Sequence, residues 1–560
     1  MDRTRRPLAV IASVLALLIL AATTLPIAAQ PAPAPAPPGT PIFGEEVEVR
    51  VVNVEVVVTD KQGNRVIGLT PKDFRLRVDG REVPVQYFSE VHEGQAVVPS
   101  TETAGTASSP AEPPSVTPGK TVGTSYLVVI DDYFAFANQR NTVLASIRDQ
   151  VDRLGPDDRM AIVAYDGRKL TMLSSWSGSP RDLKKALIAA MERPAHGVDR
   201  ATDLRTFESG RHDAPTLGST NPVIVSATTS LHFDEIGYAR LLGQQVERAA
   251  TAAASTLRAF AQPPGRKVML LLSGGWPYST QDYMLNNDRP ILSRDVPEGD
   301  KLLKPLVSTA NLLGYTIYPV DVPGIEPNPA DVQNEVPMAI NSERKFQIQQ
   351  SLQFTAKETG GRALLNSKRV DVLATAAADT TSYYWLGFTP DRKRDDKRHE
   401  VKVEVLRPGL TARARDSFFD LSRSSEVSMQ VESAILFGNP AGTSGMPMRV
   451  GKITHAGRGT MKVPLTLGLP VDRMTVLPLH GKYSAEVELR AAGLNDRGER
   501  SDIPVVPVVL TSEKAPAPNG HVRYDVTLTM RAVPQHLVVA IYDPPSGKVT
   551  LAETDVKPEK

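Results

Sequence analysis

The sequence predicts a multidomain protein of α/β plus all-β class, in which a doubly wound, mostly parallel sheet is inserted in one β-sandwich and followed by a second one. Three patterns predict it. Short apolar strands alternate with amphipathic helices over residues 125–368, which is typical of a parallel sheet covered on both faces. Strands of alternating polarity flank this region at 45–92 and 369–420, and further strands without a helical period fill 425–560. The 560 residues suffice for roughly three or four domains.

The amino terminus has the three parts of an export signal. MDRTRR is basic, the residues from Leu8 to Leu20 are apolar, and small residues follow up to Ala29. We therefore interpret residues 1–29 as a signal peptide. The alternative is an uncleaved membrane anchor, because the apolar stretch runs on through Ala22. Residues 30–44 form a Pro/Ala-rich linker. The folded part is expected to be exported and to be periplasmic, envelope-associated or extracellular.

The flanking strands are expected to form one sandwich that is split in the sequence. VEVRVVNVEVVVTD alternates apolar and polar residues, and DFRLRVDGREVPVQYF predicts two strands joined at Asp79-Gly80. Residues 45–92 offer too few strands for a stable sandwich, so we expect them to pair with 380–420, which contain SYYWLGFTPD and HEVKVEVLRPGLTARARDSFF. Between them, residues 93–124 are rich in Ser, Thr and Pro and predict a disordered linker.

The α/β region starts with the strand YLVVID, followed by the helix NQRNTVLASIRDQVDRL and the strand PDDRMAIVAYD. RKVMLLLSGGW and TIYPVD are further apolar strands, each preceded by a helical pattern. Residues 194–234 and the segment after RKVMLLLSGGW interrupt the rhythm with polar, Gly and Pro residues. Long loops at the carboxyl ends of parallel strands often bind ligands, although the first of the two is equally compatible with a disordered insertion.

The carboxyl-terminal region has strand patterns at sandwich spacing. VSMQVESAILF, TMKVPLTLGL, YSAEVELRAAGL and VRYDVTLTMRAV follow one another with turn residues between them. We expect an independent sandwich over 425–560, with VSMQVESAILF as its first strand.

Taken together, these segments resemble the acidobacterial von Willebrand factor A (VWFA)-related family of exported proteins. The resemblance is carried by VNVEVVVTDKQGNRVIGLTPKDFRLRVDG, YLVVIDDYFAF, RKVMLLLSGG, and ETGGRALLNS followed by SYYWLGFTPD, and it spans about 45–420. It implies a von Willebrand factor A (VWA) domain over 125–368. Such domains typically bind protein ligands through a metal-ion-dependent adhesion site.

That adhesion site, where intact, holds Mg²⁺ with Asp-x-Ser-x-Ser after the first strand, a Thr from a loop and an Asp after the fourth strand. Oxygen ligands of this kind suit a hard cation. Aligning Asp131 with the first aspartate places Tyr133 and Ala135 where the serines belong, and Ser273 stands where a carboxylate is expected. Asp131, Asp132 and Thr202 are therefore candidate ligands of a degenerate Mg²⁺ site. The alternative is that the two aspartates cap the helix or accept loop amides.

Other residues near this site are candidates for contact with a ligand. Trp276 and Tyr278 come directly after the fourth strand, where we expect them to be exposed, and Tyr133 and Ser273 share that edge of the sheet. Aromatic side chains at such a rim can anchor a partner. Packing against the loop over 277–300 is the alternative.

The composition excludes several classes of function. Lys+Arg is 64 and Asp+Glu is 63, so no broad positive field attracts nucleic acid, and we expect no membrane contact beyond an uncleaved amino-terminal anchor. Cysteine is absent, which excludes disulfides and thiol catalysis. HExxH, GxxxxGK and GxSxG motifs are also absent. The sequence thus predicts a non-catalytic protein that binds a protein or cell-surface ligand; the alternative is an exported hydrolase with its site in the loop insertions.

Overall fold

The structure is a computed structural model that describes residues 51–97, 121–212, 222–261, 266–280, 299–323, 338–365, 371–391, 394–438, 445–479 and 481–558. The expected signal peptide and the Pro/Ala-rich linker lie outside these ranges, as do most of the linker predicted over 93–124 and the segment 281–298. No helix within the described ranges is long and apolar enough to span a membrane.

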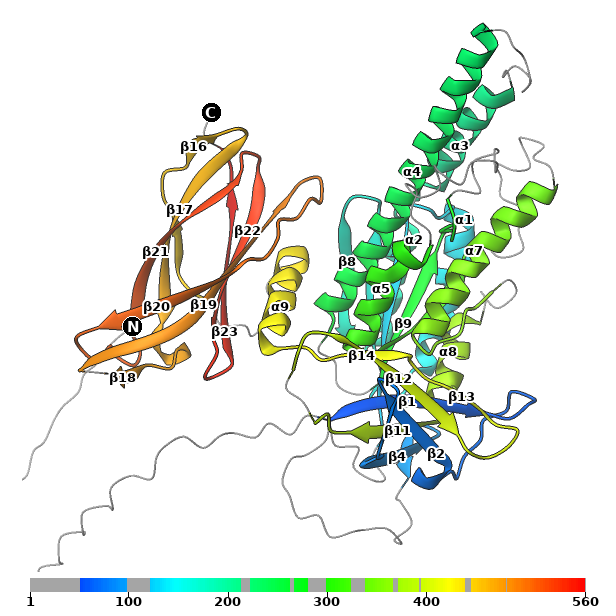
Figure 1. Cartoon of the computed structure of the whole chain (residues 1–560), viewed down its shortest axis with the longest axis horizontal. Coiled ribbons are helices and arrows are strands. Elements are labelled where there is room, and N and C mark those ends of the chain that lie inside the picture. Colours follow the sequence, from blue (N-terminus) through cyan, green and yellow to red (C-terminus); the bar gives the residue numbers. More distant parts are fainter. Residues whose placement is uncertain are drawn as a thin grey trace, which may run out of the picture. The chain divides into compact units, whose positions relative to one another are not determined.

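The α/β part is built on a five-stranded sheet with the order β10-β9-β6-β7-β8. Figure 1 labels two of its strands, β8 and β9, among the helices of this part. Four strands of the sheet are parallel, and β8 pairs with β7 in the antiparallel direction. The strands are β6 (Thr124–Asp131), β7 (Arg159–Tyr165), β8 (Leu170–Ser177), β9 (Arg266–Ser273) and β10 (Tyr315–Asp321). The helices are α1 (Ala137–Gln150), α2 (Pro180–Met191), α3 (Gly197–His212), α4 (Pro222–Ala259), α5 (Gly299–Leu313), α7 (Met338–Glu358) and α8 (Val372–Thr380).

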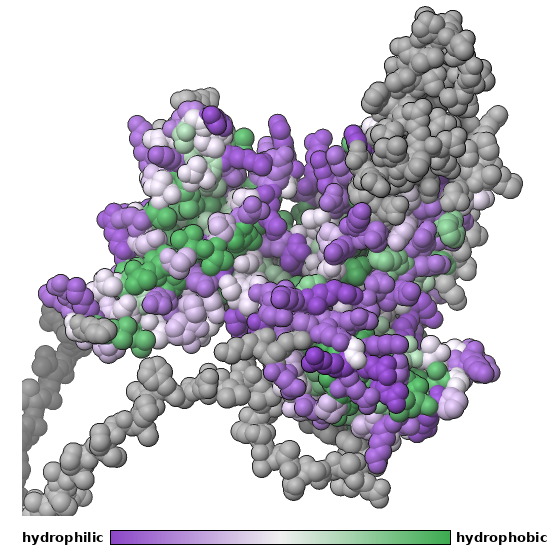
Figure 2. Space-filling view, viewed as in Figure 1, coloured by the Kyte–Doolittle hydropathy of each residue, from purple (hydrophilic) through white to green (hydrophobic). Residues whose placement is uncertain are grey.

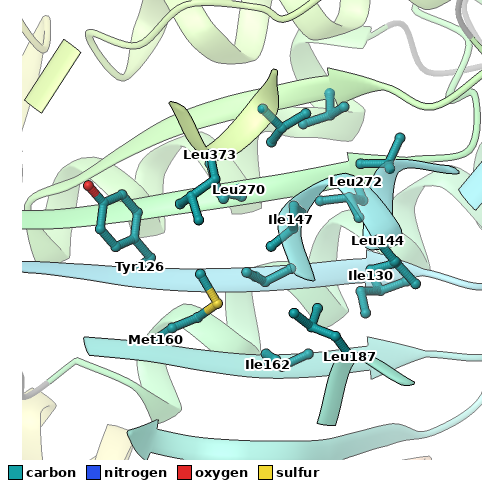
Figure 3. Packing of buried hydrophobic residues seen from close by; sticks show 14 of the residues in the cluster. Tyr126, Ile130, Leu144, Ile147, Met160, Ile162, Leu187, Leu270, Leu272 and Leu373 are labelled. Atoms are coloured by element: carbon teal, nitrogen blue, oxygen red, sulfur yellow. The ribbon is translucent and has the colours of Figure 1, made fainter. Parts of the chain in front are cut away.

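Each face of this sheet has its own apolar core because side chains alternate along a strand. Val128 and Ile130 of β6 point to the face covered by α1, α2 and α8, and Figure 3 shows Ile147, Leu187 and Leu373 from these helices in that layer. Leu127 and Val129 point to the opposite face, where α4 and α5 pack. All eight residues of β6 are buried, as a central strand covered on both faces requires.

Strands from both sides of the α/β part pair with one another. They form two antiparallel sheets with the orders β13-β1-β11-β4-β5 and β14-β12-β2-β3, which share one apolar core. The strands are β1 (Val52–Thr59), β2 (Phe74–Val78), β3 (Arg81–Val83), β4 (Tyr87–His92), β5 (Gln95–Val97), β11 (Tyr383–Phe388), β12 (Arg398–Val405), β13 (Thr411–Arg413) and β14 (Ser417–Phe419). Asp79 and Gly80 have positive φ angles of 48° and 77°, which is the backbone conformation that a tight hairpin turn needs.

The carboxyl-terminal region begins with a helix, α9 (Arg423–Phe437), and not with the strand expected for VSMQVESAILF. Its buried residues Val427, Val431, Ala434 and Ile435 recur every three or four positions, which is the helical period. Ser422 caps the helix by accepting a hydrogen bond from the amide of Ser425.

Antiparallel strands follow α9 in two sheets that share a core. They are β15 (Met448–Val450), β16 (Thr454–Gly457), β17 (Thr460–Pro470), β18 (Leu477–Leu479), β19 (Lys482–Asn495), β20 (Val505–Ser512), β21 (His521–Arg531), β22 (Gln535–Asp543) and β23 (Lys548–Val556). In Figure 2, green apolar residues gather over strands of this region, and Val509 of β20 is 63% exposed. The coarse fold class, mixed α/β followed by a β-rich carboxyl-terminal region, is confirmed.

A second expectation was wrong. The segment 194–234 was expected to be a loop, but its described residues are largely helical: α3 occupies Gly197–His212 and α4 starts at Pro222.

Candidate functional site

The candidate site lies where the parallel strands end. Asp131 is the last residue of β6 and pairs with Tyr165 at the end of β7, while Ser273 at the end of β9 pairs with Asp321 of β10. The carboxyl ends of parallel strands meet at one edge of a sheet, and we call this the carboxyl edge. Both Asp131 and Asp132 are buried there, with exposed fractions of 2% and 0%. Because a buried carboxylate needs compensating partners, their contacts decide what the site can do.

Asp131 is surrounded by hydrogen-bond donors. Its Oδ1 accepts from the backbone amides of Tyr133 and Phe134 at 3.1 and 3.2 Å. Its Oδ2 accepts from the indole Nε1 of Trp276 at 2.6 Å. Burial raises the pKa of the Asp131 carboxyl to about 6, although the indole and the backbone amides, including that of Gly274, oppose the rise. Both oxygens are thus used to hold the β6–α1 loop and Trp276 in place.

Asp132 is held by two guanidinium groups. Nη1 of Arg140 lies 2.6 Å from its Oδ1, and Nε of Arg193 lies 2.8 Å from its Oδ2. Arg140 is itself fully buried and also donates to the carbonyls of Met191 and Arg193 at 3.1 and 2.9 Å. The ion pair therefore ties the first turn of α1 to the segment after α2. Each oxygen of the buried carboxylate thus accepts a charge-assisted hydrogen bond, which compensates for the burial of its charge.

Gly274 allows the backbone after β9 to pack directly against the backbone of the β6–α1 loop. A Cβ atom at this position would lie 2.2 Å from the backbone nitrogen of Ala135. Only glycine therefore lets the end of β9 approach the β6–α1 loop so closely. This approach carries Trp276, two residues later, to Asp131.

The structure corrects the expected exposure of Trp276. Its side chain is 2% exposed, because the indole packs into the core between the sheet, α4 and α5. The indole N–H donates a hydrogen bond to Asp131. Ser273 is 1% exposed, and its Oγ accepts from the amide of Gly275 at 3.3 Å. Neither side chain is available to an external ligand.

Tyr278 and Thr202 also have internal roles. The Tyr278 ring packs edge-on against Phe354 of α7, with centroids 5.6 Å apart, and the residue is half-buried. Thr202 lies on α3, and its hydroxyl donates to the carbonyl of Val198 at 3.0 Å. No contact between Thr202 and either aspartate occurs within the described part of the chain.

These donors do not fit a Mg²⁺ ion. Tyr133 and Ala135 supply no aliphatic hydroxyl where the adhesion site has its serines, Asp131 faces N–H donors, and Asp132 faces guanidinium cations. A cation would have to displace an indole and repel two arginines, whereas Mg²⁺ dehydrates only for a set of well-placed oxygens. The indole N–H and the two guanidinium groups thus occupy the carboxylate oxygens that a metal ion would need.

Tyr133, like Tyr278, remains partly accessible, whereas Ser273 and Trp276 are buried. The Tyr133 ring lies 5.2 Å from the guanidinium carbon of Arg200, and Arg200 Nη1 donates to its hydroxyl at 3.4 Å. Val198, two residues earlier on α3, is 62% exposed. The amide of His196 donates to the Asp132 carbonyl at 2.8 Å, which fixes the start of α3 on the loop. Tyr133, His196, Val198 and Arg200 thus form an outer layer over the closed aspartates, which we call the rim.

Sequence reasoning missed Arg140, Arg193 and Arg200. A signal for Arg140 existed, because it precedes Val143, Leu144 and Ile147 by three, four and seven residues and so shares their buried helical face. An arginine on such a face requires a buried anionic partner. The two other arginines lie in the segment that was expected to be a loop or at its border, and no periodicity distinguished them.

Comparisons with known proteins do not show which family this chain belongs to. No protein-family model matches it, and no curated protein does. Among solved structures, the pilus adhesin SpaC from Lactobacillus rhamnosus GG is similar at 8% identity with a TM-score of 0.25, over 78% of this chain and 56% of the adhesin. The chain thus spans little more than half of the adhesin's length. The TFIIH p34 amino-terminal domain is similar at 10% identity with a TM-score of 0.19, over 46% of this chain and 97% of that domain. Likenesses this distant do not establish a function.

Proposed function

We propose that the chain is an exported, non-catalytic VWFA-related protein whose VWA-type α/β domain, inserted between the two halves of a split sandwich, binds a protein or cell-surface ligand without a metal ion. The observation that carries the proposal is that the carboxylate oxygens of Asp131 and Asp132 already accept hydrogen bonds from other groups of the protein. Their oxygens face an indole, backbone amides and two guanidinium groups, so they serve structure and leave neither a metal ligand nor a general base exposed.

The surface above the aspartates supports recognition by contact. The rim combines an aromatic ring, a guanidinium stacked on it and an exposed valine, and a backbone hydrogen bond from His196 ties the start of α3 to the loop after β6. Tyrosine and arginine are the residues that most often dominate protein interfaces. Such a surface binds by shape and by cation–π and polar contacts, for which it needs no divalent ion.

The proposal is tested by capture with the immobilised full-length protein from an envelope fraction of the cells that produce it. We expect the captured ligand to be retained in EDTA, because no metal takes part. Arg200→Glu should reduce capture about tenfold or more, in line with the loss of a hot-spot arginine. Arg181→Glu, an exposed arginine on α2, is the matched control and should leave capture unchanged. Loss of capture in EDTA, or equal capture by the two variants, would contradict metal-free recognition at the rim.

A further inference from the structure

The opposite edge of the parallel sheet, at the amino ends of β9 and β10, carries a cleft that the sequence did not reveal. Its volume is about 430 Å³, and it lies between the sheet, β1 and the segment around β14. A hollow of about 30 Å³ shares several of its lining residues, including Asn53, Glu55 and Arg415. The cleft has the size of a pocket for a small organic ligand.

Three cations line this cleft, and one of them, Arg394, is paired with Glu426. Arg415 is the first of the two others. Its Nη1 donates to the carbonyl of Asn311 at 2.8 Å, and its Nη2 donates to the carbonyl of Asn53 at 2.7 Å. Both partners are neutral, and the buried Nε has no hydrogen-bond partner in the described part of the chain. Burial lowers the pKa of Arg415 to about 10, although Glu55 opposes this. The guanidinium is therefore fixed in orientation but not neutralised.

Lys267 is the second cation. Its Nζ lies 3.4 Å from the carbonyl of Ala261 and 5.6 Å from the centre of the Tyr315 ring. Burial, and then the nearby Arg415, lower the pKa of Lys267 to about 8, and Glu55 opposes them. A Cβ atom on Gly314, whose φ is +70°, would lie 3.7 Å from Arg415 Nη1 and 3.8 Å from Lys267 Cε. The two cations thus flank the same glycine turn.

The carboxylates that line the cleft are engaged elsewhere. Glu55 lies 3.1 Å from Arg266, and Glu426 lies 3.1 Å from Arg394. The third, Asp420, has a carboxylate oxygen within 4.8 Å of the ligand atoms of Asp395 and His399. Among the residues that the structure describes, neither Lys267 nor Arg415 has a carboxylate within salt-bridge distance. Two neighbouring cations without an anionic partner repel each other and are costly to bury.

The walls of the cleft add an apolar surface. Trp385, Phe419 and Leu421 line it together with Leu312. A ligand that satisfies both features has one negative charge and an apolar body. A dianion such as phosphate is less suited, because Glu55 and Glu426 also line the cleft and would repel the second charge.

We propose that this cleft binds a small organic monocarboxylate, with its carboxylate between Lys267 and Arg415 and its apolar body against Trp385 and Phe419. The same chemistry is offered by a free aromatic acid and by the carboxyl terminus of a peptide that ends in an aromatic residue. The site lies at the other edge of the sheet from the rim and does not depend on the function proposed for it.

The test uses calorimetry and thermal shift on the full-length protein with four probes: 3-phenylpropionate, N-acetylphenylalanine, N-acetylphenylalanine amide and inorganic phosphate. We expect the carboxylates to bind with a Kd of about 1 mM or tighter, and the amide and phosphate to bind at least about tenfold more weakly. Binding of N-acetylphenylalanine alone identifies a peptide terminus, and binding of 3-phenylpropionate as well identifies a free acid. Equal binding of the amide, or no binding of either carboxylate, would overturn the proposal.

Variants locate the site. Lys267→Met should weaken carboxylate binding by about tenfold or more, the usual effect of losing a charge-assisted hydrogen bond. Lys267→Arg, which keeps the charge, should restore most of the affinity. Lys184→Met, a lysine of α2 paired with Asp152, is the matched control and should bind like the wild type. Unchanged binding by a folded Lys267→Met protein would place the carboxylate elsewhere and refute the assignment.

Discussion

At the carboxyl edge of the parallel sheet two buried aspartates are each held by donors that match them, whereas at the amino edge two cations share one glycine turn without a carboxylate partner. Asp132 has Arg140 and Arg193 within 2.8 Å, and Asp131 has the Trp276 indole at 2.6 Å. Lys267 and Arg415 are instead bonded to neutral carbonyls. A buried charge with a matched partner can be tolerated as part of the fold, while buried charges without one are typical of ligand sites. The two aspartates at the carboxyl edge are thus structural, and the two cations at the amino edge have the chemistry of a binding site.

The largest effect should follow removal of Asp132. Asp132→Ala leaves the fully buried Arg140 without its anion, so we expect the free energy of unfolding of the α/β part to fall by about 3–5 kcal/mol. Urea unfolding followed by the fluorescence of the buried Trp276 measures this loss. Asp199→Ala, whose side chain is 76% exposed, is the control and should change stability by less than about 0.5 kcal/mol.

A double variant separates charge from packing at this site. Asp132→Ala combined with Arg140→Met removes both buried charges, so part of the stability lost in the single variant should return. A single variant that loses less than about 1 kcal/mol would mean that Arg140 finds another partner, and the carboxyl edge would then not be the compensated one.

A smaller effect is expected for Trp276→Phe. The ring still fills the apolar space, but Asp131 Oδ2 loses its donor at 2.6 Å, which should cost about 1–3 kcal/mol. Circular dichroism during urea unfolding is the appropriate measurement, because the substitution removes a fluorophore. Trp176→Phe, which removes a half-buried indole from β8, is the comparison and should cost less. Equal losses would show that the indole N–H contributes little to holding Asp131.

The coarse fold could be predicted because its signals are local. The apolar run of β6 and the helical period of α1 each encode an element within one short segment. The helix α9 was misread because VSMQVESAILF is short and contains β-branched residues, while its helical role depends on distant partners: Glu432 accepts from Ser255 and Arg258 of α4 at 2.7 and 2.8 Å. Such partners lie more than 170 residues away in the sequence and leave no local pattern.

The position of the candidate site at the end of β6 could likewise be predicted, but its contents could not. Asp131 and Asp132 stand where the strand pattern places them. The groups that donate hydrogen bonds to their side chains belong to Trp276, Arg140 and Arg193 on three other segments. The cleft at the amino edge was missed for the same reason. Lys267 is the second residue of an ordinary strand and Arg415 follows another, and only folding brings the two cations to Gly314.

Lys267→Met should raise the free energy of unfolding, whereas the substitutions at the carboxyl edge should lower it. The folded pKa of Lys267 is about 8 against an ordinary 10.5, so below pH 8 the charged lysine destabilises the fold, and this cost disappears as the pH rises towards 10.5. The full shift corresponds to about 3 kcal/mol, but the side chain is only half-buried, and we expect the variant to gain about 1 kcal/mol at pH 7. Arg415 and Glu55 are the charged groups that face it.

The measurement is urea unfolding of wild type and Lys267→Met between pH 7 and 10. The gain should be largest at pH 7. It should shrink as the pH rises from 8 towards 10.5, because the free-energy cost of having Lys267 deprotonated in the folded protein decreases with pH. A variant that is less stable than the wild type at pH 7 would mean that the lysine is compensated after all, and the two edges would no longer differ in kind.

The smallest expected effect is that of divalent cations on the wild type, which should be none. If Asp131 and Asp132 are satisfied by an indole and two guanidinium groups, neither Mg²⁺ nor Mn²⁺ at about 10 mM should shift the melting temperature, because a ligand stabilises a fold only by binding it. Trp276→Phe is the informative partner: it frees one Asp131 oxygen but leaves Arg140 and Arg193 in place, so it too should show no shift. A shift in the variant alone would mean that the indole is what excludes the ion. A shift in both proteins that Asp131→Asn abolishes would reverse the comparison and make the carboxyl edge a metal site; a shift that persists in Asp131→Asn would place the ion elsewhere, for example at Asp395, His399 and Asp420.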